Sequence, residues 1–312
     1  MRRVAALLAA ALLGTALLGC GGGGAEPGAP KGATLVLDFQ PNAVHSGIYA
    51  AQANGDFRDQ GLDLHIQEPS STADSAKLLE TGRADFAIMD INDFGIARER
   101  GLDLVAIAAV VQRPLASVIA RDPNEIHTPA DLAGKTIGVT GVPSDDAVLD
   151  TVLRSGGVDP SSVHRVTIGF NAVADLAAGK IDAATAFWNA EGVELQQKGI
   201  PIREFRVDRF GAPRYPELLL VAQSGNQELG RRVLAGLRRG YDVLGRRPHK
   251  ALEDLLSRVP GLDRSAQMAE LDALTWSHAF SVGDALATPA LEPGAIGRWH
   301  AWAVQAGLLD QS

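Results

Sequence analysis

The chain has 312 residues, of which 46% are hydrophobic, 21% are charged and only 5% are aromatic, a composition typical of a folded globular protein. Its net charge of −8 argues against general nucleic-acid binding, because contact with the phosphate backbone requires a basic surface. The single cysteine excludes a disulfide framework within the chain, and it also excludes any cysteine-rich zinc or iron–sulfur site.

The chain begins with a short cationic stretch and an apolar run. Arg2 and Arg3 precede residues 4–18, which at about 1.5 Å per residue are too few to cross roughly 30 Å of hydrocarbon comfortably. This pattern predicts a signal peptide over residues 1–19. The run ends in Leu17-Leu18-Gly19-Cys20, which resembles the lipobox of bacterial lipoproteins. Cys20 is then the lipidated first residue of the mature chain; the alternative is an ordinary secretory peptide that ends in cysteine by chance.

The next segment has the composition of a tether. Residues 21–32 contain six glycines and two prolines but no large apolar side chain, and such a sequence behaves as a flexible coil. We therefore interpret residues 20–32 as a lipidated cysteine followed by a flexible tether. The folded body would be held at the outer face of the cell membrane by this anchor alone.

From Thr34 onward, short β-rich runs alternate with segments of helical periodicity. The predicted strands are TLVLDF (34–39), LDLHIQE (62–68), FAIMD (86–90), LVAIAAVV (104–111), ASVIA (116–120), TIGVTG (136–141), HRVTIGF (164–170), AATAFW (183–188) and LLLVAQ (218–223). Helical periodicity covers residues 72–81, 145–156 and 172–179. This alternation predicts an α/β chain with mainly parallel sheets.

A second level of organisation follows from the position of the strands. Beyond residue 223 the strand signals stop, and a helical tail suggests that the chain returns to cover the first block. The predicted tail helices are Gln227–Leu244, Pro248–Ser257, Ser265–Trp276 and Pro293–Gly307. The runs at 116–120 and 218–223 are natural crossover strands, which make a hinge with a ligand cleft between lobes. We expect lobe 1 to comprise residues 33–115 plus 221–312, and lobe 2 to comprise residues 116–220.

The densest group of polar and aromatic residues follows the first predicted strand. Phe39, Asn42 and His45 would lie at the carboxyl end of that strand, the usual ligand position of an open α/β sheet. They could present mixed donors and acceptors to a small ring. The alternative is that Pro41 and Asn42 simply start a helix, with His45 and Tyr49 packed one turn apart.

Further candidates follow later strands. Asp90 ends the third predicted strand and Asn171 follows the seventh, so both would face the same cleft, although both residue types are also common in loops. Ser144 lies in a segment that opens a helix, where free backbone N–H groups could hold a ligand oxygen. The neighbouring Asp145 and Asp146 argue against a strongly anionic ligand there, and the alternative is that they favour the helix start.

The last cluster pairs an indole with a carboxylate. Trp188 would stack on a flat heteroaromatic amine while Glu191 accepts two N–H hydrogen bonds. The alternative is an ordinary strand-to-helix turn, with Glu191 placed favourably near the helix dipole. The seven histidines show no metal-ligand or nucleophile–base spacing, so we expect neither a metal nor a cofactor.

The order of motifs resembles that of a known family. The motifs are DFQPNAVHSGIYAA (38–51), NGDFRDQGLDL (54–64), GRADFAIMD (82–90), TPADLAGKTIGV (128–139) and GKIDAATAFWNAEGVEL (179–195). Together with the lipobox and the tether, they resemble the periplasmic-binding-protein family that contains bacterial thiamine-pyrimidine precursor binding lipoproteins and fungal pyrimidine synthases. The resemblance covers about residues 33–245. Gln40 stands where the family usually has Thr.

The resemblance implies a two-lobed periplasmic-binding-protein type II fold with two crossover hinge strands. It implies that Asn42, His45 and Glu191 are polar groups of a pocket whose aromatic walls are Phe39 and Trp188. It also implies an ABC permease as partner, because a tethered binding protein cannot transport a solute by itself.

The function expected from these observations is that of a monomeric, lipid-anchored extracytoplasmic binding protein for a small heteroaromatic, an aminopyrimidine related to thiamine precursors. Alternatives are a binder of nitrate, sulfonate or another small solute, and a lipoprotein that docks a receptor instead of a permease. An enzyme of the pyrimidine-synthase type is disfavoured, because the fungal enzymes carry a cysteine-rich motif and this chain has no cysteine beyond Cys20.

Overall fold

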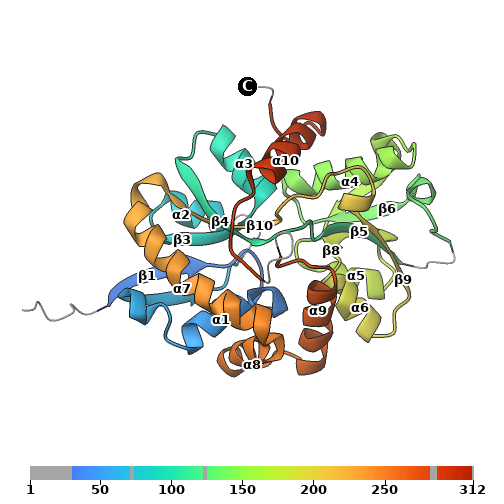
Figure 1. Ribbon diagram of the computed structural model, residues 1–312. Coiled ribbons are helices and arrows are strands. Elements are labelled where there is room, and N and C mark those ends of the chain that lie inside the picture. Colours follow the sequence, from blue (N-terminus) through green and yellow to red (C-terminus); the bar gives the residue numbers. More distant parts are fainter. Residues whose placement is uncertain (1–29, 71–73, 122–124, 282–286, 311–312) are drawn as a thin grey trace, which may run out of the picture.

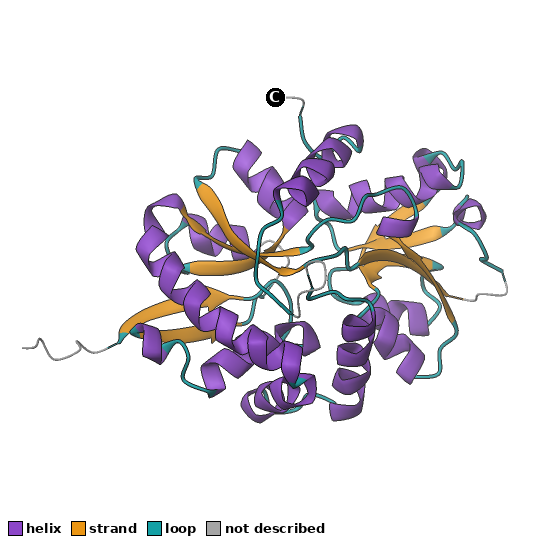
Figure 2. Cartoon of the chain, viewed as in Figure 1, coloured by secondary structure: helices purple, strands orange, loops and turns teal. Residues whose placement is uncertain are grey.

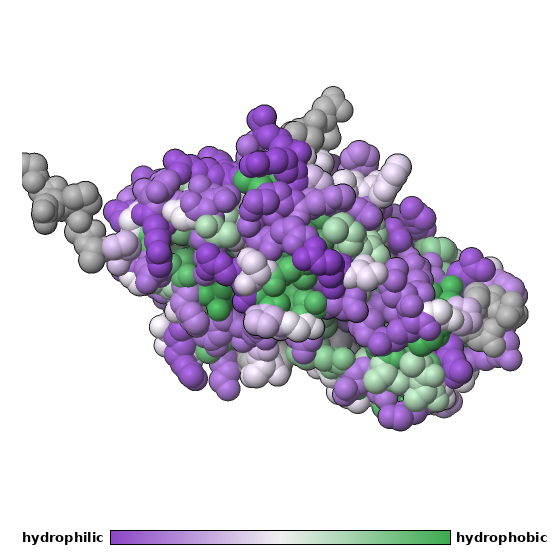
Figure 3. Space-filling model, turned by 90° about the horizontal axis from the view of Figure 1, so that it is seen from below, coloured by the Kyte–Doolittle hydropathy of each residue, from purple (hydrophilic) through white to green (hydrophobic). Residues whose placement is uncertain are grey.

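The computed structural model describes residues 30–70, 74–121, 125–281 and 287–310. The predicted signal peptide, Cys20 and most of the predicted tether lie outside the described residues. Within the described ranges, no helix combines the length and the apolar character needed to cross a membrane. The face seen in Figure 3 is mainly hydrophilic, with small and separate hydrophobic patches.

Two five-stranded sheets form two lobes, and helices flank each sheet on both faces (Figures 1 and 2). Lobe 1 has the strand order β2-β1-β3-β10-β4, and lobe 2 has the order β7-β6-β8-β5-β9. The strands of lobe 1 are β1 (Lys31–Val36), β2 (Leu62–Gln67), β3 (Phe86–Asp90), β4 (Leu104–Val111) and β10 (Leu218–Gln223). Those of lobe 2 are β5 (Ala116–Arg121), β6 (Thr136–Val139), β7 (His164–Thr167), β8 (Ala183–Phe187) and β9 (Ile202–Arg206).

The two predicted crossover strands are the antiparallel members of their sheets. β5 pairs antiparallel with β8 and β9, and β10 pairs antiparallel with β3 and β4, whereas the other strand pairs are parallel. The sheets are therefore mixed and not mainly parallel as predicted, because each crossover strand enters its sheet from the opposite end. Two crossing segments, residues 112–115 and 207–217, connect the lobes. The predicted lobe boundary at residues 220 and 221 falls inside β10.

Each lobe carries its own helices. In lobe 1 these are α1 (Ser46–Ala53), α2 (Asp74–Glu80), α3 (Ile91–Glu99), α7 (Gln227–Arg246), α8 (Pro248–Arg258) and the short 3₁₀ helix η1 (Ala43–His45). In lobe 2 they are α4 (Pro143–Ser155), α5 (Ala172–Ala177) and α6 (Glu191–Gln197). Helices α9 (Arg264–Trp276) and α10 (Pro293–Gln305) complete the tail.

Close packing of α7 against α1 fixes the segment that precedes α1. A Cβ atom on Gly240 would lie 2.1 Å from the carbonyl oxygen of Gly47, so only glycine permits this approach. Every fourth residue along α7 is buried, from Leu229 through Val233 to Leu237, which is the spacing of an amphipathic helix packed on a core.

Strand β9 was not predicted. Its sequence is IREFR, in which three of five residues are charged, and only Phe205 is fully buried. It lies at the edge of its sheet, where one side of the strand has no neighbour. Few buried positions on an edge strand leave a weak apolar signal in the sequence.

The tail contacts lobe 2 as well as lobe 1, the block that the sequence suggested it covers. Helix α9 packs against η1 in lobe 1 and against α6 in lobe 2. On α10, the Trp299 indole N–H donates to Asn92 Oδ1 of lobe 1 at 2.7 Å, and the Trp302 indole N–H donates to Thr151 Oγ1 of lobe 2 at 3.2 Å. Figure 1 shows α9 and α10 at opposite ends of the junction between the lobes.

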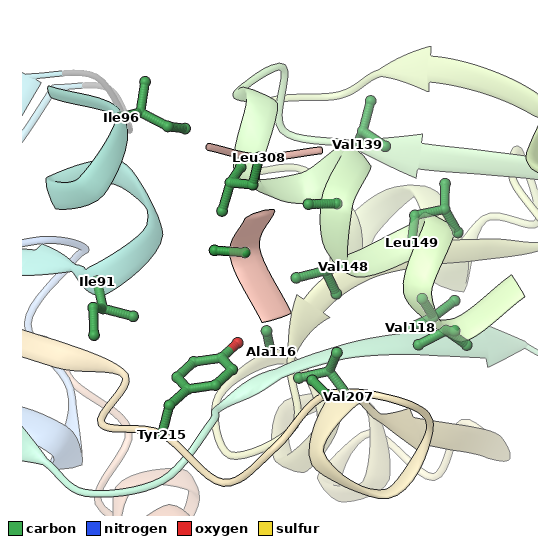
Figure 4. Close-up of a cluster of buried hydrophobic side chains, with 14 of the residues drawn as sticks. Ile91, Ile96, Ala116, Val118, Val139, Val148, Leu149, Val207, Tyr215 and Leu308 are labelled. Carbon is green, nitrogen blue, oxygen red and sulfur yellow. The ribbon is translucent and has the colours of Figure 1, made fainter. Parts of the chain in front are cut away.

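One hydrophobic cluster runs through this junction (Figure 4). Ile91 and Ile96 of α3 lie on one side, Val148 of α4 lies on the other, and Leu308 after α10 lies between them. Tyr215 of the second crossing segment belongs to the same cluster and stacks on Trp302, with ring centroids 5.4 Å apart. The core is therefore shared by both lobes and the tail.

The bond between Trp299 and Asn92 gives a test of the tail's role. Trp299→Phe keeps an aromatic ring but leaves Asn92 Oδ1, which is buried, without its donor. We expect the free energy of unfolding in urea to fall by about 1 to 3 kcal/mol. Trp276→Phe is the matched control, because Trp276 is 85% exposed, and its unfolding should be unchanged. Equal stability of the two variants would contradict a stabilising contact between tail and lobe.

Candidate binding cavity between the lobes

A cavity of about 640 Å³ is lined by residues of both lobes. Lobe 1 contributes Asp38 and Phe39 after β1, and Asp90 at the end of β3. Lobe 2 contributes Phe187 at the end of β8 and Glu191 at the start of α6. These positions lie at the carboxyl ends of parallel strands, where open α/β sheets bind ligands.

The lobes touch directly around this cavity. The ring of Phe39 meets that of Phe170 edge to face, with centroids 4.8 Å apart, and lies 6.5 Å from that of Phe187. Ser144 Oγ in the first turn of α4 donates to Asp93 Oδ1 of α3 at 2.9 Å. Contacts of this kind between opposing lobes define a closed arrangement, in which a bound ligand would be largely removed from water.

The lining of the cavity is acidic. Its carboxyl groups belong to Asp38, Glu80, Asp90, Asp93, Asp145 and Glu191. Its cations are Lys77 and Arg100, and both are exposed, as is Glu80 among the acids. Six acids against two cations favour a ligand that is positively charged or rich in N–H donors, because ionised carboxylates only accept hydrogen bonds.

Burial raises the pKa of several of these carboxyl groups. The pKa of Glu191 rises to about 7, chiefly through burial, although the backbone N–H of Phe187 donates to its Oε2 at 3.0 Å. The pKa of Asp93 also rises to about 7, through burial and the nearby charge of Asp90. Burial raises the pKa of Asp145 as well, and Thr140 opposes this by donating to it from its backbone and its hydroxyl. Ligand N–H groups would favour the ionised form of these acids.

Four of the eight candidate residues named from the sequence line the cavity. They are Phe39, Asp90, Ser144 and Glu191. Asp90 also caps α3, since its Oδ1 accepts from the backbone N–H of Asn92 at 2.6 Å. A role in starting a helix and a place in the cavity wall are therefore compatible.

Asn42 and His45 lie behind the wall. Asn42 Oδ1 caps η1 by accepting from the backbone N–H of Val44 at 3.0 Å. The ring of His45 is 1% exposed; its Nδ1 accepts from the backbone N–H of Asn42 at 3.1 Å, so its Nε2 carries the proton and donates to Asp38 Oδ1 at 3.0 Å. His45 thus orients an acid of the cavity and does not itself line it.

Trp188 and Asn171 also lie outside the lining. Trp188 is fully buried between the lobes, where its indole N–H donates to the carbonyl of Pro114 at 3.0 Å and the guanidinium of Arg206 lies 4.0 Å from its ring centroid. Asn171 is exposed, and its side chain donates to the carbonyl of Ile168 at 2.9 Å. The chain turn that brings Phe187 to the cavity points Trp188 away from it.

The sequence reasoning did not select several lining residues. Asp38, Phe170 and Phe187 lie within predicted strands and Asp93 lies three residues after one, but the sequence did not indicate them as site residues. Their common signal is position, because each lies within a few residues of the carboxyl end of a strand. No group of three or more metal-ligating side chains is arranged for a metal ion within the part of the chain that the structure describes.

Solved structures identify the class of fold. The alkanesulfonate-binding protein SsuA from Xanthomonas axonopodis pv. citri, bound to MOPS, is 18% identical and covers 91% of this chain and 96% of its own, with a TM-score of 0.71. The periplasmic aliphatic sulphonate binding protein SsuA from Escherichia coli is 17% identical, with 90% and 92% covered and a TM-score of 0.66. The chain therefore has the two-lobed fold of periplasmic binding proteins, as expected.

The chain belongs to the NMT1/THI5-like family, whose model matches residues 42–251. A formylaminopyrimidine-binding protein from Halalkalibacterium halodurans is 34% identical over 228 residues, 72% of this chain and 69% of the relative. The 4-amino-5-hydroxymethyl-2-methylpyrimidine phosphate synthase THI5 from Saccharomyces cerevisiae is 26% identical over 245 residues, 74% of this chain and 72% of the relative. These relatives confirm the family resemblance drawn from the motifs.

Proposed function

We propose that the protein is the extracytoplasmic substrate-binding component of an ABC importer and that it binds an aminopyrimidine related to thiamine precursors. The observation that carries this proposal is a cavity between two lobes whose lining includes three phenylalanine residues and Glu191. The relative named as a formylaminopyrimidine-binding protein supports the same ligand class.

The chemistry of the cavity matches a flat ring with an amino edge. Phe39, Phe170 and Phe187 offer apolar faces and edges against which a heteroaromatic ring packs. Glu191 keeps lone pairs for ligand N–H donors beyond the one bond from Phe187. A sulfonate or nitrate would instead meet an excess of carboxyl groups. This excess disfavours anionic solutes, although a solved structure with the same fold is of an alkanesulfonate-binding protein.

Binding is also favoured over catalysis. Some relatives are named as synthases, but this chain has no cysteine beyond Cys20, and both ring nitrogens of His45 are engaged within the protein. If the protein were a synthase that consumed one of its own side chains, such as His45, its intact mass would fall during turnover. We expect mass spectrometry to find an unchanged chain after incubation with aminopyrimidine ligands and with candidate cofactors, and a loss of imidazole atoms would contradict the proposal.

Titration calorimetry tests the ligand class directly. The chain from residue 30 onward should bind 4-amino-5-hydroxymethyl-2-methylpyrimidine at least 100-fold more tightly than an alkanesulfonate, a difference of about 2.7 kcal/mol. Equal or tighter binding of the sulfonate would overturn the proposal. We further propose that the two lobes of a monomer, which are joined by the crossing segments 112–115 and 207–217, close around this ligand.

Binding should depend on pH through the raised pKa of Glu191, which is about 7. A neutral aminopyrimidine donates to the ionised carboxylate, and at pH 6 that group must first lose a proton. We therefore expect the affinity to rise with pH by up to about tenfold per unit below pH 7 and to level off above pH 8. Calorimetry at pH 5.5, 6.5, 7.5 and 8.5 checks this, and an affinity that falls over this range would contradict it.

Attachment to the membrane rests on Cys20, which lies outside the described residues. We propose that it is lipidated, because it follows an apolar run and precedes a glycine-rich tether; two acyl chains suffice for stable anchoring where one is marginal. Cys20→Ala should move the protein from the membrane fraction to the soluble fraction of cells while leaving ligand affinity unchanged. Cofractionation of Cys20→Ala with membranes, as for the parent, would contradict a lipid anchor.

A further inference from the structure

Glu217 is a buried acid directly behind the cavity wall, at the end of the second crossing segment. Its side chain is 0% exposed, and its Oε2 accepts from the backbone N–H of Leu115 in the first crossing segment at 2.9 Å. Its own carbonyl accepts from the backbone N–H of Ile91, at the start of α3, also at 2.9 Å. Glu217 therefore connects both crossing segments with the helix that Asp90 caps.

The Glu217 carboxyl group lies against that of another acid, Asp90. Oε1 is buried and finds no donor within the described residues, and the side chain is in hydrogen-bond contact with that of Asp90. The backbones of the two residues are close, because Leu218, which follows Glu217, pairs with Asp90 where β10 and β3 run antiparallel. Two ionised carboxylates cannot form a hydrogen bond with each other, since both only accept. A hydrogen bond between them requires one proton on the pair.

The surrounding charges favour keeping that proton. Asp38 and Asp93 face Asp90, and Asp208 and the Tyr215 hydroxyl face Glu217. Asp208 also pairs with Arg113 at 2.5 Å. Each of these acids disfavours a second negative charge on the pair. In agreement, burial and the charge of Asp90 hold the pKa of Glu217 well above its usual range, whereas the pKa of Asp90 rises only to about 6.

We propose that Glu217 is a neutral positioning residue, whose carboxyl O–H donates to Asp90 and so presents Asp90 to the cavity as an ionised acceptor for the ligand. Glu217 contacts no ligand itself. The ligand part of this inference rests on the proposed function, since Asp90 needs an N–H donor to accept from. The inference that Glu217 carries a proton does not rest on the proposed function, because this proton belongs to the protein without ligand.

The proton is tested by unfolding, without any ligand. Glu217→Gln keeps the shape of the side chain; its amide oxygen accepts from Leu115 and its NH₂ donates to Asp90, so the contact survives without a titrating group. In the parent, folding raises the pKa of Glu217, so the stability from its protonated form is complete below the unfolded pKa and is lost as pH rises towards the folded pKa. From pH 5 to pH 8 the unfolding equilibrium constant of the parent should rise relative to that of Glu217→Gln, by up to about tenfold per pH unit.

Other titrating groups are common to both proteins and cancel in this ratio. Glu228→Gln, on the exposed face of α7, is the matched control, and its ratio to the parent should not vary with pH. A ratio for Glu217→Gln that is equally constant would overturn the proposal. If Glu217→Gln does not fold, Asp90→Asn gives a second test: it removes the charge that raises the pKa of Glu217 beyond the effect of burial, so the pH dependence of unfolding should be weaker than in the parent.

The positioning role is tested by binding of 4-amino-5-hydroxymethyl-2-methylpyrimidine at pH 7. Glu217→Gln should bind within about threefold of the parent, whereas Glu217→Met, which has no donor for Asp90, should bind at least 10-fold more weakly. If the glutamine variant binds like the parent and the methionine variant does not, the effect comes from the hydrogen bond donated to Asp90 and not from the packing of the side chain. Equal affinities of the Met and Gln variants would overturn the positioning role, while a parent that binds no aminopyrimidine would overturn the proposed function and leave the unfolding test intact.

Discussion

Glu191→Gln is expected to weaken binding of an aminopyrimidine by roughly 30- to 1000-fold, or about 2 to 4 kcal/mol. The structure fixes which way the new amide points. The backbone N–H of Phe187 needs the acceptor that Glu191 Oε2 now supplies, so the amide oxygen of glutamine turns towards Phe187. Its NH₂ group then faces the amino edge of the ligand, which places donor against donor and removes a charge-assisted hydrogen bond.

The control for this experiment lies one turn further along the same helix. Glu194 is exposed and pairs with Lys198, so Glu194→Gln should bind the ligand like the parent. Because burial raises the pKa of Glu191, the empty Glu191→Gln protein should be no less stable than the parent at pH 8. Parent-like affinity of Glu191→Gln in calorimetry would remove this residue from the site, and a large loss of stability would show that it mainly supports the start of α6.

Trp188→Ala is expected to lower the free energy of unfolding by about 3 to 5 kcal/mol, the usual cost of removing a buried tryptophan from a core. Trp188 packs with the core of lobe 1 although it follows a strand of lobe 2. Its backbone N–H donates to the carbonyl of Leu115 at 3.1 Å, its indole N–H donates to Pro114, and Arg206 covers its ring. It therefore fastens lobe 2 to the first crossing segment.

Urea unfolding of Trp188→Ala beside Trp276→Ala measures this effect, and Trp276→Ala should unfold like the parent because its side chain is exposed. The preference of Trp188→Ala for an aminopyrimidine over a sulfonate should persist under conditions where it is folded, since Trp188 does not line the cavity. A stable variant that has lost its ligand preference would contradict this placement and would restore Trp188 as a wall of the site.

The strands were predictable because most of them are buried. β3, β4 and β10 have the predicted bounds, and each is a short, mainly apolar run. In β3 and β10 only the last residue is half-buried, and in β4 three residues near its start are half-buried. The predicted run at 34–39 extends three residues past the end of β1, because Leu37 is apolar and buried although it lies in the loop that enters the cavity. Local hydrophobicity reports burial, and it does not distinguish a buried strand from a buried loop.

The site was harder to predict because it is assembled from two lobes. Position after a strand indicated Phe39, Asp90 and Glu191, but it could not separate Phe187 from Trp188, which are neighbours that point to different sides of the same turn. The contact between Ser144 and Asp93 joins residues 51 positions apart in the sequence. Nothing in the sequence indicated a role for Glu217, since a single acid before an apolar strand is common. Its role can be inferred only from the fold, which brings it against Asp90.

The acidity of the cavity links these observations. A binding cavity lined by acids with raised pKa values, such as Asp93 and Glu191, would hold some of them protonated when empty at mildly acidic pH. When a ligand with N–H donors binds, its hydrogen bonds take the place of the protons on these carboxyl groups. The same carboxyl groups therefore reject anions and select for amines. Affinity and pH response should therefore change together in variants of Glu191.

A crystal structure of the protein with 4-amino-5-hydroxymethyl-2-methylpyrimidine would test the central claim most directly. The account predicts the ring between the lobes, against Phe39 and Phe187, with its amino nitrogen at a hydrogen-bond distance of about 3 Å from a carboxylate oxygen of Glu191. A ring bound outside this cavity, or one whose amino group points away from both Glu191 and Asp90, would contradict it.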